Sequence, residues 1–372
     1  MNVAFEDDFI VLADEFRQIL QVIIWPVVIV GLVANLAVIL RILLPIKNNK
    51  NSNLKPFYRS SLISLAAADL LMLLASGTNT LSNLSSKTFI WNLSSAACTL
   101  IPYLQTVAMI VASLNLAFVA IDRFAAIQPR LPPAKSSNSL GILIMIIIIT
   151  WSIALGSSYP VLNIYTSETV TIITNSTAYT AALCIVNDRN SAATIYTALF
   201  TVIFLPLATV FILVYILLAR SIYKKKFPGN QSTGGSISQE ISTASTSITT
   251  SAPKPVKNKK IPMHVIRKRR TVRVILILIG VFVLCRMPQW SFLVTKLYIK
   301  VSHKFWWHLQ VILTLLSLIN AAVHPFLYAF LNEALSLVTW INSLCIKSTS
   351  KESSKDIPDS ITVKIPRSPY AA

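Results

Sequence analysis

The sequence predicts an all-α membrane protein, a bundle of seven transmembrane helices with a short amphipathic helix after the seventh. Of its 372 residues, 54% are hydrophobic and 13% are charged, and the mean hydropathy is +0.64. This composition is too apolar for an ordinary soluble domain. A helix needs about 20 apolar residues to cross a bilayer. Runs of that size lie at 21–44, 58–76, 100–121, 140–162, 192–218, 272–296 and 306–331.

The first apolar run is predicted to be a membrane helix and not a cleavable signal peptide. Several acidic residues between Glu6 and Glu15 precede it, whereas a signal peptide begins with a basic segment. The run is also too long for the apolar part of a signal peptide. We therefore expect residues 1–22 to form an outer tail and residues 23–331 to form the bundle.

The charge distribution indicates which end of each helix faces inward. A net charge of +19 could indicate a nucleic-acid-binding protein. With the N-terminus outside, however, most of the 33 Lys and Arg residues fall on the inner side. This is the positive-inside pattern of membrane proteins. Attraction to anionic lipid explains it, so we expect membrane lipid and no nucleic acid as a partner.

Glycosylation motifs give an independent test of the same orientation. Asn83, Asn92 and Asn175 each begin an Asn-X-Ser/Thr tripeptide in a loop that the charge pattern places outside. A fourth such tripeptide, at Asn230, falls inside and is interpreted as a chance match. The three outer residues are therefore predicted glycosylation sites.

Polar linkers lie on the predicted inner side. Residues 220–271 form the longest loop, rich in Ser and Thr in its middle and basic toward its end. Residues 332–345 have apolar side chains every three positions, which predicts an amphipathic helix on the membrane surface. Cys345 at its end is either a palmitoylation site or a reduced thiol. Residues 346–372 are polar and predicted to be disordered.

The residues that punctuate the helices resemble, in order and position, those of rhodopsin-like (class A) G-protein-coupled receptors. They are Asn35, Asp69, Cys98, the triplet Asp122-Arg123-Phe124, Trp151, Pro160, Pro206, Phe282, Pro288, Asn320, and His324-Pro325 followed by Tyr328. The stretch 328–332 is most similar to peptide receptors of the galanin, allatostatin and somatostatin type.

This resemblance implies a receptor in the plasma membrane, with its N-terminus outside, that transmits the binding of an extracellular neuropeptide to a heterotrimeric G protein. It assigns Asp122, Arg123 and Phe124 to G-protein coupling, with Asp122 holding Arg123 until the bundle opens. It assigns the activation core to Asn35, Asp69, Phe282, Arg286, Pro288, Asn320, His324, Pro325 and Tyr328.

A disulfide bond is predicted between Cys98 and Cys184. Cys98 begins the third helix and Cys184 lies in the second outer loop, so both are on the oxidising side. Cys285 lies within a helix and Cys345 lies inside. The bond is expected to hold the loop over the mouth of the ligand cavity.

Asp69 lies in the middle of a membrane helix and must have a partner there. In the family that this chain resembles, the corresponding Asp binds a sodium ion together with polar neighbours. Two of those neighbours are changed here, to Ala112 and His324, and Arg286 replaces a Trp that packs beneath the ligand. Either a cation at Arg286 or His324 neutralises Asp69, or Arg286 reaches upward into the ligand cavity.

Two residues that other receptors use to bind amines or retinal are missing, which disfavours both ligand classes. Gln105 stands where amine receptors have an Asp, and Leu318 stands where opsins have the Lys that binds retinal. The remaining cavity candidates suit a peptide with an amidated or aromatic end. They are Gln105, Met109, Gln289, Trp290, Gln310 and Thr314.

Three other functions compete with that of a peptide receptor. The changes at Arg286 and His324 leave open a chemosensory receptor for a small environmental molecule, or a decoy that binds without signalling. A membrane transporter would need paired halves or discontinuous helices, and the sequence indicates neither. No catalytic set, metal-ligand cluster or phosphate-binding loop is evident, so we expect no enzyme activity, metal or cofactor.

Overall fold

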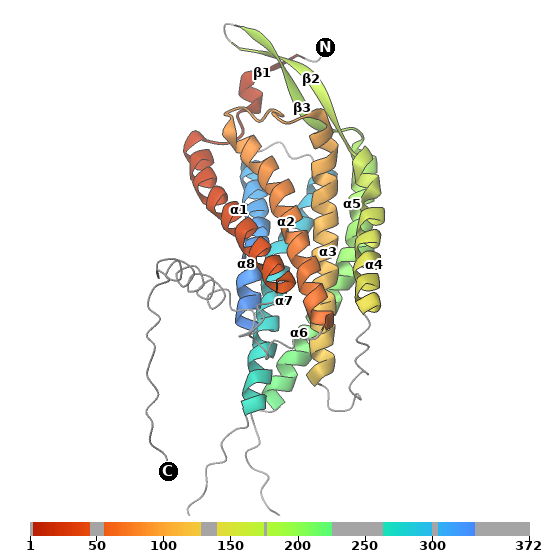
Figure 1. Cartoon of the computed structure of the whole chain (residues 1–372). Helices are drawn as coiled ribbons and strands as arrows, with labels where there is room; N and C mark the ends of the chain where they lie inside the picture. Colours follow the sequence, from red (N-terminus) through yellow and green to blue (C-terminus); the bar gives the residue numbers. More distant parts are fainter. Residues whose placement is uncertain are drawn as a thin grey trace, which may run out of the picture.

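The chain folds into a bundle of long helices with a small β-sheet at one end (Figure 1). The computed structural model describes residues 3–44, 56–127, 140–174, 177–224, 263–299 and 304–331. The helices are α1 (Asp14–Leu43), α2 (Pro56–Ser85), α3 (Ser95–Ile127), α4 (Leu140–Ser158), α5 (Arg189–Leu199), α6 (Leu205–Lys224), α7 (Met263–Tyr298) and α8 (Lys304–Leu331). Because α5 continues through the π-helical turn η3 (Phe200–Phe204) into α6, the helices of the described residues correspond to the predicted apolar runs.

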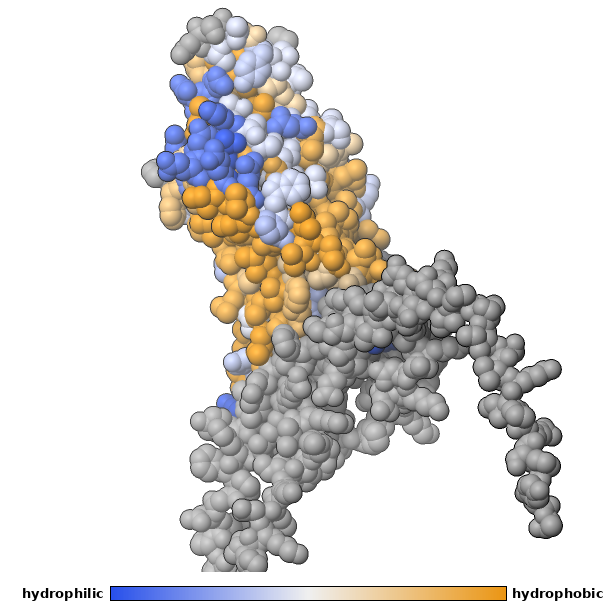
Figure 2. Space-filling view, turned by 60° about the vertical axis from the view of Figure 1, so that its left-hand side comes forward, coloured by the Kyte–Doolittle hydropathy of each residue, from blue (hydrophilic) through white to orange (hydrophobic). Residues whose placement is uncertain are grey.

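The outside of the bundle is apolar over the middle of its length. Figure 2 shows this apolar surface below a more hydrophilic end. Val22, Val202 and Leu284 have exposed fractions of 72%, 71% and 73%, which lipid tails tolerate and water does not. Six helical stretches of the described residues are long and apolar enough to cross a membrane. Helix α7 packs among them, against α5, α6 and α8.

Proline explains the π-helical turn within the fifth predicted run. Pro206 has no backbone N–H to donate, and its ring crowds the carbonyl four residues earlier, which favours a wider turn just before it. Leu205 donates its N–H to the carbonyl of Phe200, five residues back, as a π-helix requires. The turn places the ring centroids of Phe200 and Phe204 at 6.5 and 5.3 Å from that of Trp290 on α7.

A three-stranded sheet lies over one end of the bundle, called here the sheet end, and the sequence analysis did not predict it. Strands β2 (Tyr165–Ile173) and β3 (Ala178–Val186) form an antiparallel hairpin with Ser167 opposite Cys184. The tail strand β1 (Val3–Phe5) adds to β2 in parallel, with Val3 opposite Thr171. Thr, Val and Ile make up most of β2, whereas β3 has one of each beside three Ala; the β-branched residues favour extended structure. Short 3-10 helices, η1 (Glu6–Phe9) and η2 (Tyr159–Asn163), precede α1 and β2.

The helices pack closely in the half of the bundle that contains α1, α2 and α8. A Cβ added at Gly31 of α1 would lie 2.8 Å from the Cδ1 of Leu73 on α2 and 3.0 Å from the Cβ of Ala322 on α8. A side chain here would force Leu73 to move and would crowd Ala322, so glycine suits this approach, as is common between membrane helices. Nearby, Asn35 donates hydrogen bonds to the carbonyls of Gly31 and Ala321, at 2.9 and 3.1 Å.

Several sequence predictions concern residues outside the described ranges. The amphipathic helix at 332–345, its Cys345, the tail 346–372 and most of the loop 220–271 belong to this group. They stay predictions. Within the described part, α1 begins at Asp14, earlier than the expected bundle boundary at residue 23. Acidic side chains at Asp14 and Glu15 favour this start because they face the positive end of the helix dipole.

Candidate ligand-binding site

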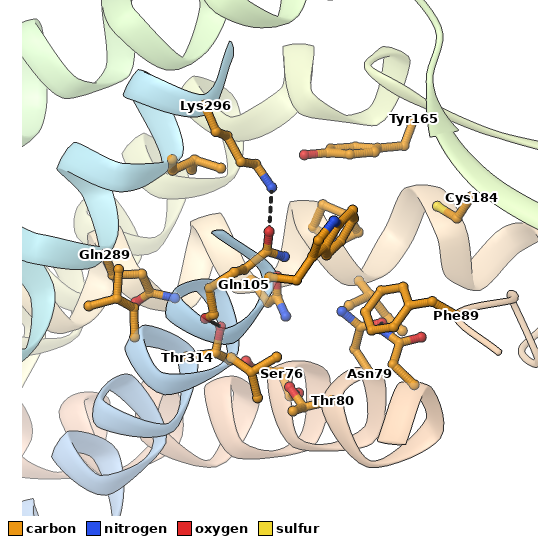
Figure 3. A pocket seen from close by; sticks show the side chains of 18 of the residues that line it. Ser76, Asn79, Thr80, Phe89, Gln105, Tyr165, Cys184, Gln289, Lys296 and Thr314 are labelled. Atoms are coloured by element: carbon orange, nitrogen blue, oxygen red, sulfur yellow. Dashed lines mark hydrogen bonds between the residues drawn. The ribbon is translucent and has the colours of Figure 1, made fainter. Parts of the chain in front are cut away.

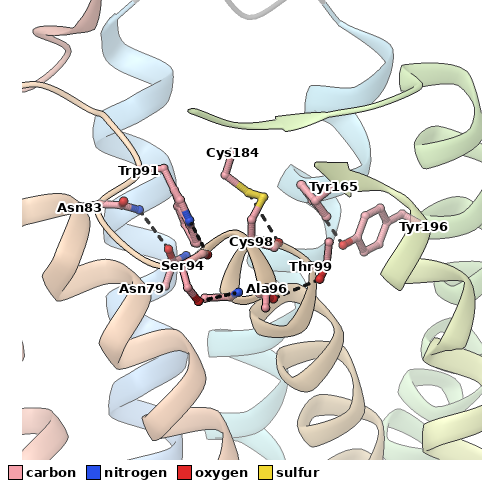
Figure 4. Close-up of a disulfide and its surroundings, with 11 residues drawn as sticks. Asn79, Asn83, Trp91, Ser94, Ala96, Cys98, Thr99, Tyr165, Cys184 and Tyr196 are labelled. Atoms are coloured by element: carbon pink, nitrogen blue, oxygen red, sulfur yellow. Dashed lines mark hydrogen bonds between the residues drawn. A yellow bond between two sulfur atoms is a disulfide. The ribbon is translucent and has the colours of Figure 1, made fainter. Parts of the chain in front are cut away.

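The predicted disulfide is present and anchors the sheet to the bundle (Figure 4). Cys98, fully buried near the start of α3, bonds to Cys184 of β3 with a Cα–Cα distance of 5.6 Å. The backbone N–H of Trp91, in the loop before α3, donates to the carbonyl of Ala182 at 2.8 Å. The hairpin is therefore attached at two points over the sheet end of the bundle.

A cavity of about 560 Å³ lies at the sheet end, lined by residues of α2, α3, α5, α7, α8 and the hairpin (Figure 3). This volume falls within the roughly 300–1,000 Å³ typical of ligand pockets. The lining includes all six residues that the sequence analysis named as ligand candidates: Gln105, Met109, Gln289, Trp290, Gln310 and Thr314. The structure therefore brings these residues together, although their contact with a ligand stays a prediction.

Trp290 belongs to a packed aromatic cluster at the edge of the cavity. Its side chain is only 2% exposed, and its indole N–H donates to the sulfur of Met109 on α3. Ring centroids of Tyr196 and Phe204 lie 6.4 and 5.3 Å away. Trp290 and Met109 are thus held by packing before any ligand binds, which favours a preformed pocket.

The sequence analysis missed the polar side of α2 that lines the cavity. Four polar residues follow the i, i+3, i+4, i+7 spacing of one helix face. They are Ser76, Asn79, Thr80 and Asn83. The sheet end of α2 is polar on its other faces as well, at Thr78 and Ser82, so the sequence alone does not mark these four residues as a cavity wall. Asn83 is half-buried there and donates to Asn79 at 3.2 Å.

Two further polar groups of the cavity were also missed. Tyr165 of β2 lies with its hydroxyl 3.4 Å from that of Tyr196 on α5. Burial raises the pKa of Tyr165, although the hydrogen bond with Tyr196 opposes the rise, so its phenol is neutral and can donate or accept. Lys296, at the sheet end of α7, donates from Nζ to Oε1 of Gln310 at 3.1 Å. The sequence analysis assigned no role to either residue.

Asp69 lies in a buried polar cluster on the far side of the cavity from the sheet. His324 Nδ1 is 2.8 Å from Asp69 Oδ2, and both side chains are fully buried. Arg286 is also fully buried and donates to the hydroxyl of Ser317. The sequence left open whether a cation at Arg286 or His324 neutralises Asp69, or whether Arg286 reaches into the cavity. In the structure, His324 is the residue that contacts Asp69. Arg286 neither lines the cavity nor makes a hydrogen bond to Asp69 among the described contacts.

The residues around Asp69 do not suit the sodium ion that the family resemblance implies. Oδ2 of Asp69 already contacts His324, and the neighbouring position on α3 is the apolar Ala112. A cation such as sodium requires several oxygen ligands, and here His324 takes up one carboxylate oxygen while Ala112 supplies none, although Oδ1 of Asp69 and Oδ1 of Asn320 have no hydrogen-bond partner among the described residues.

The predicted G-protein-coupling residues lie at the other end of the bundle. Asp122, Arg123 and Phe124 belong to the last turns of α3, away from the sheet, but their side chains are outside the described part. The same holds for the side chain of Tyr328 on α8. Of the predicted glycosylation sites, Asn92 is exposed in the loop before α3, and Asn175 is outside the described residues. Asn83 lies within α2 and lines the cavity, so its predicted position in a loop is wrong.

Comparison with known proteins identifies the family. Residues 34–328 match the family described as 7 transmembrane receptor (rhodopsin family). Prokineticin receptor 1 of Homo sapiens is 23% identical over 209 residues, which cover 55% of this chain and 45% of the relative. Prokineticin receptor 1 of Bos taurus is 22% identical over 209 residues, which again cover 55% of this chain and 45% of the relative.

The chain therefore belongs to the rhodopsin family of seven-transmembrane receptors. This confirms the predicted seven-helix fold and the recognition of the family from its helix-by-helix residues. The rhodopsin family consists of signalling receptors and not of enzymes. The region matched in the curated relatives spans less than half of their own length.

Proposed function

We propose that this protein is a G-protein-coupled receptor for a neuropeptide and that the peptide binds in the cavity at the sheet end. The composition of the cavity lining is the observation that supports this proposal. It is lined by aromatic rings, amides and hydroxyls, the groups that recognise peptide bonds and aromatic side chains. The similarity to receptors named for prokineticin supports the same class of ligand.

We also propose that the sheet end faces the cell exterior and that the receptor lies in the plasma membrane. The Cys98–Cys184 disulfide supports this orientation, because such bonds persist in oxidising surroundings. The exposed Asn92 of the same end carries a glycosylation motif. The end of α3 with Arg123 then faces the cytoplasm, where a heterotrimeric G protein would bind.

A signalling screen tests the proposal. Cells that express the receptor are exposed to the neuropeptides of the source organism and, separately, to a panel of small odorants, and G-protein activation is recorded. We expect activation by a peptide. Gln105→Leu and Gln289→Leu, which remove amides from the cavity lining, should weaken that peptide at least about tenfold, because a buried partner loses its hydrogen bond.

Leu284→Ala is the matched control, because Leu284 lies on the same helix as Gln289 but points outward with 73% of its side chain exposed. It should leave peptide potency unchanged. Activation by odorants alone would contradict the neuropeptide proposal. Equal potency on the wild type and both cavity variants would show that the peptide binds elsewhere.

A further inference from the structure

One cation lies among the uncharged groups of the cavity. Lys296 lines it together with amides, hydroxyls and aromatic rings, and no described Asp or Glu belongs to that lining. The side chain is half-buried. Figure 3 shows it pointing toward the other lining residues, with a dashed line marking its hydrogen bond to Gln310. The cavity therefore has a positive charge without a described counter-charge.

The ammonium of Lys296 keeps donor capacity for a ligand. It carries three N–H donors, and the described contacts use one, to the neutral oxygen of Gln310 at 3.1 Å. A partly desolvated ammonium gains most from a negatively charged acceptor, because charge-assisted hydrogen bonds are about twice as strong as neutral ones. A ligand carboxylate would supply that acceptor.

The position of Lys296 is fixed by its surroundings. Arg189 at the start of α5 donates to the backbone carbonyls of Lys296, Leu297 and Ile299, at 3.0, 2.8 and 2.6 Å. This arginine satisfies the last carbonyls of α7 and holds its end against α5.

The nearest acid along the chain to this arginine is already in use. The carboxylate of Asp188 caps α5, accepting from the backbone N–H groups of Asn190 and Ser191, both at 3.1 Å. The hydroxyl of Ser191 also donates to this carboxylate. That bond, which has the largest effect, and the two backbone bonds hold the pKa of Asp188 below its usual value. Asp188 thus remains charged at its cap, and it does not line the cavity.

We propose that Lys296 binds a carboxylate of the ligand in the cavity that the aromatic residues Phe292 and Trp307 also line. This inference rests on the proposed function and makes it more specific. The carboxylate has two possible sources in a peptide: a free C-terminus, or the side chain of an Asp or Glu. Lys296 would be a specificity-determining residue that distinguishes acidic peptides from amidated, acid-free ones.

Paired peptide libraries test the proposal. Four pools share the same random neutral core and differ in two features, a C-terminal carboxylate or amide and the presence or absence of one Asp or Glu. Each pool is applied to cells that express the wild type, Lys296→Gln, Lys296→Arg or Lys304→Gln, with surface expression measured by an epitope tag. Lys304 is exposed at the start of α8 and outside the cavity lining, so it is the matched control.

We expect the pools with a carboxylate to activate the wild type at least about tenfold more potently than the amidated, acid-free pool, as loss of a charge-assisted hydrogen bond predicts. Lys296→Gln should lose this preference, and Lys296→Arg and Lys304→Gln should keep it. Comparing the acid-terminated pool with the acidic-side-chain pool identifies the source of the carboxylate.

Three other outcomes would contradict, in turn, the carboxylate site, its location at Lys296 and the peptide-receptor function. Equal potency of the amidated, acid-free pool on the wild type would overturn the carboxylate site while leaving the peptide-receptor function intact. A preference for carboxylates that survives in Lys296→Gln would place the anion site elsewhere. Failure of all four pools on well-expressed wild type would count against the peptide-receptor function and, with it, the inference.

Discussion

At the scale of single residues, the contact between Asp69 and His324 sets this receptor apart from the pattern that its family resemblance implies. A buried carboxylate needs compensation, and His324 provides it at 2.8 Å from within the protein. The contact joins α2 to α8, so the compensating group is part of the helix packing. An external ion is therefore not required to satisfy Asp69.

We predict that agonist binding is insensitive to sodium. His324 occupies one oxygen of Asp69 and Ala112 provides none, so a sodium ion would gain too little by binding. Agonist affinity should be equal in sodium chloride and in a matched salt of a large organic cation. His324→Asn should introduce a sodium effect, because an amide oxygen replaces the imidazole. A several-fold sodium effect on the wild type that disappears in Asp69→Asn would contradict the prediction.

The sequence predicted many of the individual residues of the cavity and missed others for a physical reason. Residues such as Gln105 and Trp290 could be predicted because the family pattern fixes the helix on which each lies and its position along that helix. Lys296 could not, because a lysine near a predicted helix end normally extends into solvent. Its place in the cavity depends on how Arg189 and Gln310 hold the end of α7, which involves residues far apart in the chain.

At the scale of elements, the helices could be predicted because each apolar run must form its own backbone hydrogen bonds in lipid. The sheet could not be predicted in the same way. Its hairpin lies beyond the apolar runs, where periodicity is weak, and β1 pairs with β2 across more than 160 residues of chain. Such pairing depends on the disulfide and on the helix ends that bring the segments together.

We predict that the disulfide is needed for both stability and ligand binding. Cys184→Ser should lower the free energy of unfolding by about 2–5 kcal/mol, the usual effect of losing a native disulfide. It should also weaken peptide binding, because the hairpin that carries the lining residue Tyr165 loses its anchor on α3. Thermal melting and ligand titration of the purified receptor measure the two effects. Cys285→Ser, which removes a thiol outside the disulfide, should change neither.

Helix packing gives a second prediction at this scale. Gly31→Val should destabilise the receptor by about 1–3 kcal/mol, because overpacking forces neighbouring side chains and backbone apart. The added carbons would collide with Leu73 and Ala322. Gly156→Val on α4 is the control, since a Cβ there meets nothing within 4 Å. Equal melting temperatures for the two variants would show that α1 does not pack against α2 and α8 as described.

At the scale of the whole molecule, packed aromatic rings extend from the cavity into the bundle. Ring centroids of Trp290 and Phe204 lie 5.3 Å apart, those of Phe204 and Phe282 lie 6.4 Å apart, and those of Phe282 and Phe211 lie 5.2 Å apart. These rings come from α7 and from the helix that contains the π-helical turn. Movement of Trp290 would therefore require adjustment of both helices, because close-packed interiors do not deform continuously.

The end of the bundle opposite the sheet contains the predicted coupling residues. Arg123 lies in the last turns of α3, whereas the cavity is lined near the other end of the same helix by Gln105 and Met109. Arg123→Ala should abolish G-protein activation, because the cytoplasmic partner loses its predicted contact. Agonist affinity, measured without G protein, should change by no more than about twofold, since distant sites act independently to within about 0.5 kcal/mol. Activation assays and ligand titration are made on the same membranes, with Arg123→Lys as the variant that keeps the charge. Undiminished activation in Arg123→Ala would remove Arg123 from the coupling site, and a large loss of agonist affinity would show that the two ends of the bundle are not independent.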